Sequence, residues 1–295
     1  GLLHDHFAFD ARYSNIRSDG YIDRATARMS SYYASAAFYE ANTMIKFQAF
    51  GNSEKTYQAW TGVPSSKLKT DRTYNPCGEY EEDGVTKFYK NQTDNYNQHN
   101  YHLTATRRLP GGWDMALTLH YTDGNGYYED YKAGAKYADY RLPAYVDAGG
   151  TPVKKTDLVR RKWLDNTFYG AVYNANLRTE NGLQLSLGAA ANRYEGNHFG
   201  RVMWTKQSGG LPEPDYEYYR NRGKKTDYNA YAKTNYRLGR DFHAYVDLQY
   251  RGIDYTIRGS DDKAGDHLQV AKHWDFFNPK IGLNFNRGIH NAFAS

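Results

Sequence analysis

Apolar and polar residues alternate with a period of two along much of the chain, and this pattern constrains the fold more than any other feature. The segment WDMALTLHY (residues 113–121) places Trp113, Met115, Leu117, Leu119 and Tyr121 on one side and mostly polar residues on the other. Successive side chains of a strand point to opposite faces, so this segment predicts a strand between two unlike environments. Similar segments predict ten strands, near residues 7–13, 32–38, 43–49, 101–105, 113–121, 169–177, 183–192, 228–238, 242–251 and 277–285.

The connections between these strands alternate in length. Tight turns are expected at residues 40–42, 110–112, 180–182 and 239–241. Long polar segments lie between them, at residues 18–28, 58–95, 124–164, 197–225 and 258–275. Short turns on one side and long loops on the other are typical of an outer-membrane β-barrel, in which a complete strand ladder satisfies the backbone within lipid. The predicted fold class is therefore all-β, an antiparallel up-and-down transmembrane β-barrel meander.

A large soluble β-sandwich or propeller is the main alternative, because its strands also alternate. Its packed core would favour larger, interlocking side chains than the alanines on the apolar faces, such as Ala36, Ala189 and Ala191. The mean hydropathy of −0.89 excludes a helical membrane protein. The aromatic content of 16% argues against disorder.

Charge, cysteine and motif content exclude several functions. The net charge of +5 comes from residues of both signs spread along the chain, which argues against a nucleic-acid partner. The single cysteine, Cys77, can form neither an internal disulfide nor a zinc site. No G-x-S-x-G, H-E-x-x-H, P-loop or G-x-G-x-x-G motif is present, so we expect no enzyme, no catalytic residue, no cofactor and no metal site.

Two groups of residues are candidates for function. Charged and polar residues on the polar sides of the strands would face the lumen of a barrel, as either a hydrated interior or a ligand pathway; these are Arg12, Lys46, His120, Lys233, Asp247 and Arg251. Aromatic rings and a histidine in the long loops could stack on or bind a ligand; these are Trp60, Tyr74, Tyr127, Tyr128, Tyr140, His198 and Trp204.

A rival interpretation is an autonomous ten-stranded outer-membrane barrel, either an omptin-like protease or an adhesin. The only compact acidic and histidine cluster available to such an enzyme is Asp261, Asp262, Asp266 and His267. It lies on one expected loop, whereas a site of that kind draws its groups from opposite walls.

Seven short segments, taken in order, resemble the barrel of TonB-dependent outer-membrane receptors, particularly those of Bacteroidetes-like bacteria. They are GLLHDHFAFD (1–10), SDGYIDR (18–24), EKTYQAWTGVP (54–64), DRTYNP (71–76), WLDN (163–166), EGNHFG (195–200) and FFNPK (276–280). Each segment is short, so the specificity lies in the ordered set.

This resemblance implies a 22-stranded barrel with an N-terminal plug domain, which imports a scarce nutrient with energy delivered through TonB. Ten strands are too few for that barrel, so we expect residues 1–295 to be a single internal barrel segment, without the plug and the remaining strands. The implied location is the bacterial outer membrane. The implied partners are outer-membrane lipid, the plug domain of the same full-length chain, TonB and a small-molecule nutrient, with a ferric siderophore expected and haem, cobalamin or a glycan as alternatives.

Overall fold

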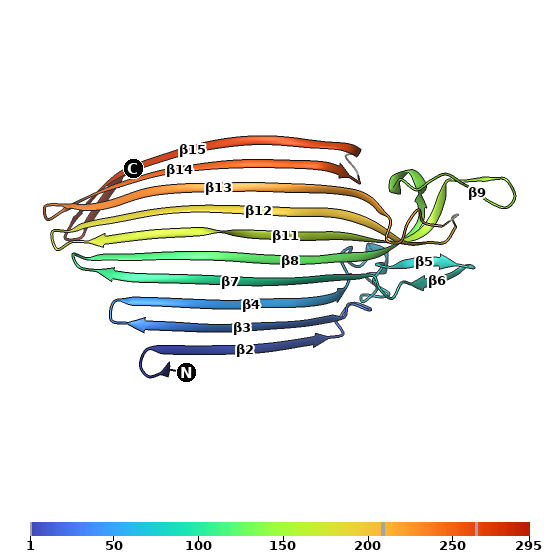
Figure 1. The fold of residues 1–295 in the computed structure, drawn as a ribbon, viewed down its shortest axis with the longest axis horizontal. Helices are drawn as coiled ribbons and strands as arrows, with labels where there is room; N and C mark the ends of the chain where they lie inside the picture. The colour runs from blue at the N-terminus through green and yellow to red at the C-terminus, as the bar shows by residue number, and fades with distance from the viewer. Residues whose placement is uncertain (1, 208–209, 263–264) are drawn as a thin grey trace.

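The computed structural model describes residues 2–207, 210–262 and 265–295, and most of them belong to one antiparallel sheet of twelve strands (Figure 1). The strands of this sheet are neighbours in chain order, as in a meander. They are β1 (Leu2–Leu3), β2 (Phe7–Ser18), β3 (Ala27–Glu40), β4 (Thr43–Tyr57), β7 (Thr93–Leu109), β8 (Trp113–Lys136), β11 (Lys155–Arg178), β12 (Leu183–Thr205), β13 (Glu217–Leu238), β14 (Phe242–Asp261), β15 (Gly265–Arg287) and β16 (His290–Ala294).

The long connections carry small elements of their own. The β4–β7 connection contains the 3-10 turn η1 (Ser65–Lys67) and the hairpin β5 (Glu79–Glu82) and β6 (Val85–Phe88). The β8–β11 connection contains η2 (Tyr137–Tyr140) and the hairpin β9 (Tyr145–Val146) and β10 (Pro152–Val153). These elements lie at one end of the sheet, here called the loop end, and the tight turns gather at the opposite end (Figure 1).

All ten predicted strands are present, and the antiparallel up-and-down topology is confirmed. The expected loop boundaries are wrong, because the strands continue far toward the loop end. Residues 124–136 and 155–164, expected in a loop, belong to β8 and β11. Both strands are 24 residues long, whereas about 9–11 residues cross a bilayer. Charged, aromatic and apolar side chains are mixed on both faces of the extensions, which removes the alternation, but the ladder pairing continues.

Most of the tight turns contain a glycine with left-handed backbone, whereas Ala41 takes this conformation in the turn between β3 and β4. Gly112, between β7 and β8, has a φ of +86°, and a Cβ at this position would lie closer than 3.0 Å to the carbonyl oxygen of Arg178. Only glycine adopts this conformation without strain and leaves room for the neighbouring strand.

The register gives the sheet two unlike faces. One cross-strand row reads Phe9, Ala36, Phe47, Leu103, Leu119, Ala171, Ala191 and Tyr228 from β2 to β13. The next row reads Asp10, Ser35, Gln48, His102, His120, Gly170, Asn192 and Asp227 on the same strands. We call the two sides the apolar face and the polar face. Many large side chains of the apolar face are exposed, including Phe47, Leu103 and Leu119.

Aromatic side chains mark the border of the apolar band toward the loop end. Tyr101, Tyr121 and Tyr169 are directly opposite one another on β7, β8 and β11. The next outward positions on β8 along the same face are Asp123 and Asn125. An apolar band of about nine residues that ends in an aromatic row is the arrangement expected of strands that cross lipid.

Tyrosine rings lie over glycines of the neighbouring strand. Five directly opposite pairs show this arrangement: Tyr32 with Gly51, Tyr96 with Gly126, Tyr219 with Gly200, Tyr228 with Gly252 and Tyr231 with Gly188. In each pair a Cβ on the glycine would lie closer than 3.0 Å to the tyrosine ring. The ring occupies the space that a side chain would fill, so it covers backbone that would otherwise be bare.

The sheet is not closed. Among the described residues, β1 pairs with β2 only at Phe7 and Ala8, and β16 pairs with β15 only over residues 283–287. Bare edges therefore run along residues 9–18 and 265–282, and two short terminal strands cover the rest of each edge. This open sheet contradicts an autonomous closed barrel of ten strands.

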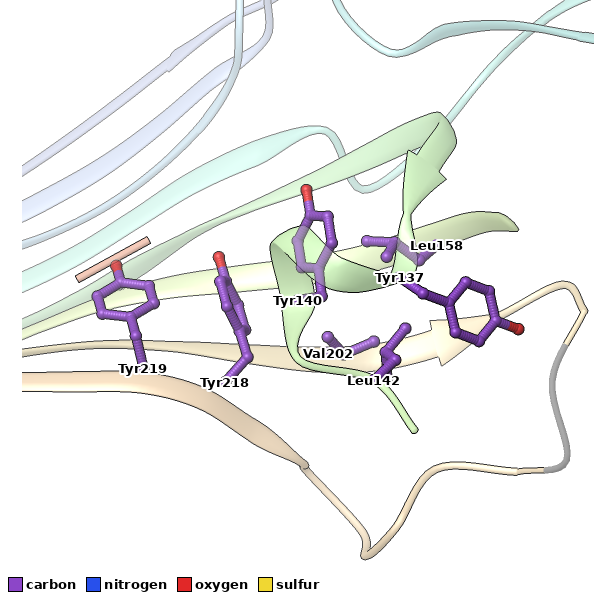
Figure 2. Close-up of a cluster of buried hydrophobic side chains, with 7 residues drawn as sticks. All are labelled: Tyr137, Tyr140, Leu142, Leu158, Val202, Tyr218 and Tyr219. Carbon is purple, nitrogen blue, oxygen red and sulfur yellow. The ribbon is translucent and has the colours of Figure 1, made fainter. Parts of the chain in front are cut away.

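The buried hydrophobic cluster of the described residues lies at the loop end, where side chains of β11, β12 and β13 meet those of η2 and Leu142 (Figure 2). No helix in the described part of the chain is long and apolar enough to cross a membrane.

Candidate functional site

Charged residues occupy the middle of the polar face. The register places the six expected lumen residues, Arg12, Lys46, His120, Lys233, Asp247 and Arg251, on this one face. Most lie beside a partner of opposite charge or a hydrogen-bonding group. Sequence periodicity therefore identified which side of each strand carries these groups.

The contacts of these residues link neighbouring strands. Arg251 Nε lies 3.1 Å from Asp227 Oδ2, and Lys233 Nζ lies 3.7 Å from Asp247 Oδ2. His120 Nε2 lies 2.8 Å from Asn192 Oδ1, reaching across Gly170 of the strand between them. A Cβ on Gly170 would collide with Asn192, so this glycine permits the contact.

A hollow of about 630 Å³ opens on this part of the polar face. Its lining includes Asn192, Lys225, Asp227, Gln249 and Arg251. Amides and paired charges can exchange hydrogen bonds with water or a polar ligand in many arrangements. The surface is thus suited to a hydrated passage.

Nearer the loop end, three consecutive cations of β11 each contact an acidic residue. Arg160 forms a two-bond fork with Asp130 of β8, with Nε–Oδ1 at 2.8 Å and Nη2–Oδ2 at 3.2 Å. Lys162, on the same face, pairs with Asp262. The fork is nearly buried, since the side chains of Arg160 and Asp130 are 14% and 5% exposed. Such charge-assisted hydrogen bonds hold β8 and β11 in register near the loop end.

Arg161 points to the opposite face, as expected for the middle residue of three in a strand. Its Nε lies 2.6 Å from Glu129 Oε2, and the Tyr89 hydroxyl donates to the other oxygen of this carboxylate at 2.5 Å. Tyr89 follows β6 in the long connection. The hydrogen bond from Tyr89 to Glu129 therefore attaches the β4–β7 connection to β8.

Tyrosines dominate the buried cluster beside Arg160. Its members are Tyr137, Tyr140, Leu142, Leu158, Val202, Tyr218 and Tyr219 (Figure 2). The ring centroids of Tyr140 and Tyr218 are 4.9 Å apart, and those of Tyr218 and Tyr219 are 5.0 Å apart. Figure 2 shows the hydroxyls of these three residues pointing to the same side. Burial raises the pKa of the Tyr140 hydroxyl, so it remains a neutral hydrogen-bond donor at physiological pH.

A β-bulge brings Tyr218 and Tyr219 together. The register of β12 and β13 shifts between Gly200 and Arg201, which pair with Tyr219 and Glu217 and leave Tyr218 as the extra residue. A bulge re-aims a side chain that would otherwise point to the opposite face. The Tyr218 hydroxyl is buried and has no hydrogen-bond partner in the described part of the chain.

A second hollow, of about 570 Å³, adjoins this cluster on the polar face. Tyr128, Lys162, His198, Tyr219 and Asp262 line part of it. Trp60, from the β4–β7 connection, meets the Tyr128 ring edge-on, with centroids 5.3 Å apart. The hollow therefore combines aromatic surface with charged and neutral hydrogen-bonding groups, which is the composition of a small-molecule site.

The structure brings five of the seven expected ligand residues to this hollow or next to it, and Tyr127 is one of those that line it. Tyr128 and His198 line it, Trp60 packs on Tyr128, and Tyr140 packs on Tyr218 of the adjoining cluster. Tyr74 lies in the β4–β7 connection, where its ring faces Phe88 at 6.4 Å.

Tyr127 borders this hollow although alternation along β8 directs it to the opposite face from Tyr128, and Trp204 lies on that opposite face. Tyr127 contacts Trp163, with ring centroids 4.4 Å apart, and Trp204 stacks on Tyr131 at 6.3 Å. The placement of Tyr127, Tyr128, His198 and Trp204 in loops was wrong, since they lie on β8 and β12. The strand extensions described above account for the difference.

Sequence reasoning missed Arg160 and Lys162 as residues of this region. The cations at 160–162 and the acidic residues at 129–130 were a possible signal, because Arg160 and Asp130 lie equally far along their strands from Tyr169 and Tyr121, which pair in the structure. Tyr218 depends on the bulge, which the sequence does not reveal.

The proposed enzyme cluster is not assembled. Asp262 pairs with Lys162, and Asp266 pairs with Arg141 at 2.5 Å. Within the described ranges, no group of three or more His, Cys, Asp or Glu side chains is placed to hold a metal ion.

Comparisons with known proteins support the fold. No family model and no curated protein sequence matches the chain. The structure resembles the ferric-catecholate import receptor Fiu of E. coli K12 in its closed form, with a TM-score of 0.66 and 12% identity over 99% of this chain and 46% of that one. It also resembles the ferric citrate transporter FecA, with a TM-score of 0.67 and 10% identity over 99% of this chain and 39% of that one.

A third similar structure is the ferric yersiniabactin uptake receptor FyuA of Yersinia pestis, with a TM-score of 0.63 and 9% identity over 99% of this chain and 42% of that one. The chain thus spans less than half the length of each of these proteins. All three are TonB-dependent transport receptors of the outer membrane, not enzymes. The resemblance expected from the sequence is confirmed at the level of the fold: the sheet has the fold of part of their barrel.

Proposed function

We propose that residues 1–295 form one sector of the barrel of a TonB-dependent receptor, which imports a ferric siderophore across the bacterial outer membrane. The plug domain and the remaining strands would belong to other parts of the same full-length chain. The observation that carries this proposal is the two-faced open sheet, which superposes over 99% of its length on about half, or less, of each neighbouring receptor.

In this proposal the two faces have different surroundings. The apolar face, with exposed side chains such as Phe47 and Leu119, contacts outer-membrane lipid. The polar face, with Lys233, Asp247 and Arg251, lines the lumen around the plug. TonB acts on the receptor through the plug region, outside these residues.

The loop end would capture the ligand. Trp60 and Tyr128 offer an aromatic edge, and His198 and Lys162 add polar groups on the same side. The similar structures are described as receptors or transporters for ferric catecholates, ferric citrate and ferric yersiniabactin, which supports an iron chelate as the cargo. Haem, cobalamin and a glycan are the competing ligands that the test must include.

The test is uptake and binding by the full-length receptor. Each aromatic contact with a ligand is worth about 0.5–1.5 kcal/mol, so Trp60→Ala with Tyr128→Ala should weaken binding of the imported compound roughly tenfold. Trp204→Ala is the matched control, because its ring lies on the opposite face. Equal affinities of the two variants would refute the assignment of the loop-end hollow.

Labelled ferric siderophore, haem, cobalamin and oligosaccharide, supplied separately, identify the cargo. Import of haem, cobalamin or the oligosaccharide without import of the ferric siderophore would refute the siderophore. The coding sequence on both sides of this segment tests the architecture: it must encode a plug upstream and further strands downstream.

A further inference from the structure

The loop-end hollow, of about 570 Å³, has an excess of negative charge. Four carboxylates line it, those of Glu54, Asp94, Asp261 and Asp262. Within the described part of the chain, Lys162 is the one lysine or arginine in this lining, and it pairs with Asp262. The carboxylates therefore outnumber the cations of the hollow.

The histidine of the hollow does not balance this excess. Burial lowers the pKa of the His198 imidazole, against an opposite effect of the nearby Asp261. An unperturbed histidine has a pKa of about 6.5, so His198 is neutral at physiological pH.

The register places two of the carboxylates away from Lys162. Asp94 of β7 is directly opposite Tyr128 of β8, which is directly opposite Lys162 of β11. Two strand spacings, about 10 Å, thus separate the backbones at Asp94 and Lys162. Glu54 of β4 lies two residues from Thr56, the direct partner of Asp94, so Glu54 and Asp94 are diagonal neighbours on one face. We call these two residues the acidic wall.

The acidic wall has no counter-charge of its own. Neither Glu54 nor Asp94 forms an ion pair within the described ranges. Burial raises the pKa of the Asp94 carboxyl, because loss of water disfavours its charged form. The two carboxylates also repel each other. A cation placed beside both would offset the repulsion and the loss of water.

Aromatic rings beside the acidic wall are also suited to a cation. Tyr96 is directly opposite Glu54, and Tyr128 is directly opposite Asp94. Both rings line the hollow, and Trp60 packs edge-on against Tyr128. The negative face of an aromatic ring attracts an ammonium group that lies within about 6 Å of its centroid. Carboxylates and rings therefore favour the same kind of ligand group.

We propose that the acidic wall and its aromatic neighbours bind a positively charged amine of the imported ligand. The proposal rests on the proposed function, which assigns the ligand to this hollow, and it narrows the cargo to an iron chelate with an ammonium group. Ferric catecholates and ferric citrate, after which two of the similar structures are named, are anionic, so the acidic wall would repel them. Such a wall selects by repulsion as well as by attraction.

The test measures binding to the full-length receptor in nanodiscs, with ferrioxamine B as the probe. This ferric trihydroxamate has a neutral iron centre and one terminal ammonium group, and its N-acetyl derivative lacks that charge. Because hydrogen bonds between charged groups are the strong ones, the unaltered receptor should bind ferrioxamine B at least tenfold more tightly than the N-acetyl derivative.

The test variant combines Glu54→Gln with Asp94→Asn and should lose this preference. The matched control combines Glu81→Gln with Asp83→Asn, which removes the same charge from exposed positions of the β5–β6 hairpin and should retain it. Equal affinity of the unaltered receptor for the two compounds, or the same preference in the test and control variants, would overturn the proposal.

An anionic ferric tricatecholate separates the effect of charge from damage to the fold. The test variant should bind this compound about fivefold more tightly than the control does, because it has lost repulsive charge. A distorted hollow would instead bind every compound more weakly, and that result would overturn the proposal.

Import of the same compounds is scored separately from binding. Import of ferric chelates, together with equal affinities for ferrioxamine B and its N-acetyl derivative, would overturn the acidic wall and leave the proposed function intact. Import of haem, cobalamin or an oligosaccharide without import of a ferric chelate would refute the proposed function, while the paired affinities still decide whether the acidic wall binds a cation.

Discussion

The tyrosine–glycine pairs predict an unusual mutational effect, in which a single added methyl group weakens one glycine site and strengthens another. Gly188 of β12 lies under the Tyr231 ring, and a Cβ there would come closer than 3.0 Å to three atoms of that side chain. Ordinary carbon contacts are about 3.5–4.0 Å, so the ring must move when Gly188→Ala is introduced. Gly223 of β13 is the matched control, because a Cβ there would meet nothing within 4 Å.

The magnitude follows from two opposing terms. Overpacking costs about 1–3 kcal/mol, whereas replacing a strand glycine by alanine gains about 0.5–1 kcal/mol by restricting the unfolded chain. Gly188→Ala should therefore lower the free energy of unfolding by about 0.5–2 kcal/mol. Gly223→Ala should leave it unchanged or raise it by up to about 1 kcal/mol.

Reversible urea unfolding of the full-length receptor in lipid vesicles, followed by tryptophan fluorescence, measures both changes. A double-mutant cycle with Tyr231→Ala isolates the contact, since Gly188→Ala should become neutral or stabilising once the ring is absent, a coupling of about 1–3 kcal/mol. The reasoning fails if Gly188→Ala has the same effect with and without the ring, or if Gly223→Ala is equally destabilising.

Two further predictions concern ion pairs at the loop end and elsewhere. Asp130→Asn leaves the nearly buried Arg160 without its charged partner and should lower the free energy of unfolding by about 3–5 kcal/mol. Asp114→Asn disrupts an exposed ion pair with Arg108 and should lower it by less than about 1 kcal/mol. Equal urea midpoints of the two variants would contradict this prediction. The hydrogen bond and charge of Lys87 lower the pKa of Glu82 in the β5–β6 hairpin. The ion pair between them therefore stabilises the folded hairpin at pH values above the unfolded pKa of Glu82, about 4.3. This stabilisation is lost as the pH falls through the lower pKa of the folded hairpin. Hydrogen exchange of the hairpin should accelerate over that acidic range, and a Glu82→Gln variant, which lacks the bond at every pH, should not show the same acceleration.

The sequence predicted the lipid-facing half of each strand and failed in the other half, for a physical reason. Leu117 and Leu119 alternate with polar neighbours because one face needs only apolarity. Beyond Tyr121 the sequence Asp-Gly-Asn-Gly, at residues 123–126, looks like a turn, but the structure pairs all four residues in a ladder. This part alternates glycine with a polar residue and has no apolar side chain, so periodicity carries no signal and pairing with the neighbouring strands maintains it.

The candidate site was predictable only in part, for the same reason. Aromatic content singled out Tyr128 and Tyr140, but whether a ring lies on the polar or the apolar face depends on the strand register near it. Tyr127 and Tyr128 are adjacent in β8 and alternate between its two faces, yet both border the hollow. The pairing of Arg160 with Asp130 and the bulge at Tyr218 are properties of neighbouring strands, which no single segment contains.

The strand extensions affect the free energy of ligand binding. Tyr128, Lys162, His198 and Tyr219 all project from ladder-bonded backbone, so their positions are set before any ligand arrives. Ordering an interface side chain on binding costs about 0.5–1.5 kcal/mol, and a preorganised wall avoids much of this cost. Trp60, which packs on Tyr128, lies instead on the long β4–β7 connection, outside the strand ladder. Any backbone movement that accompanies ligand binding would therefore be concentrated in that connection.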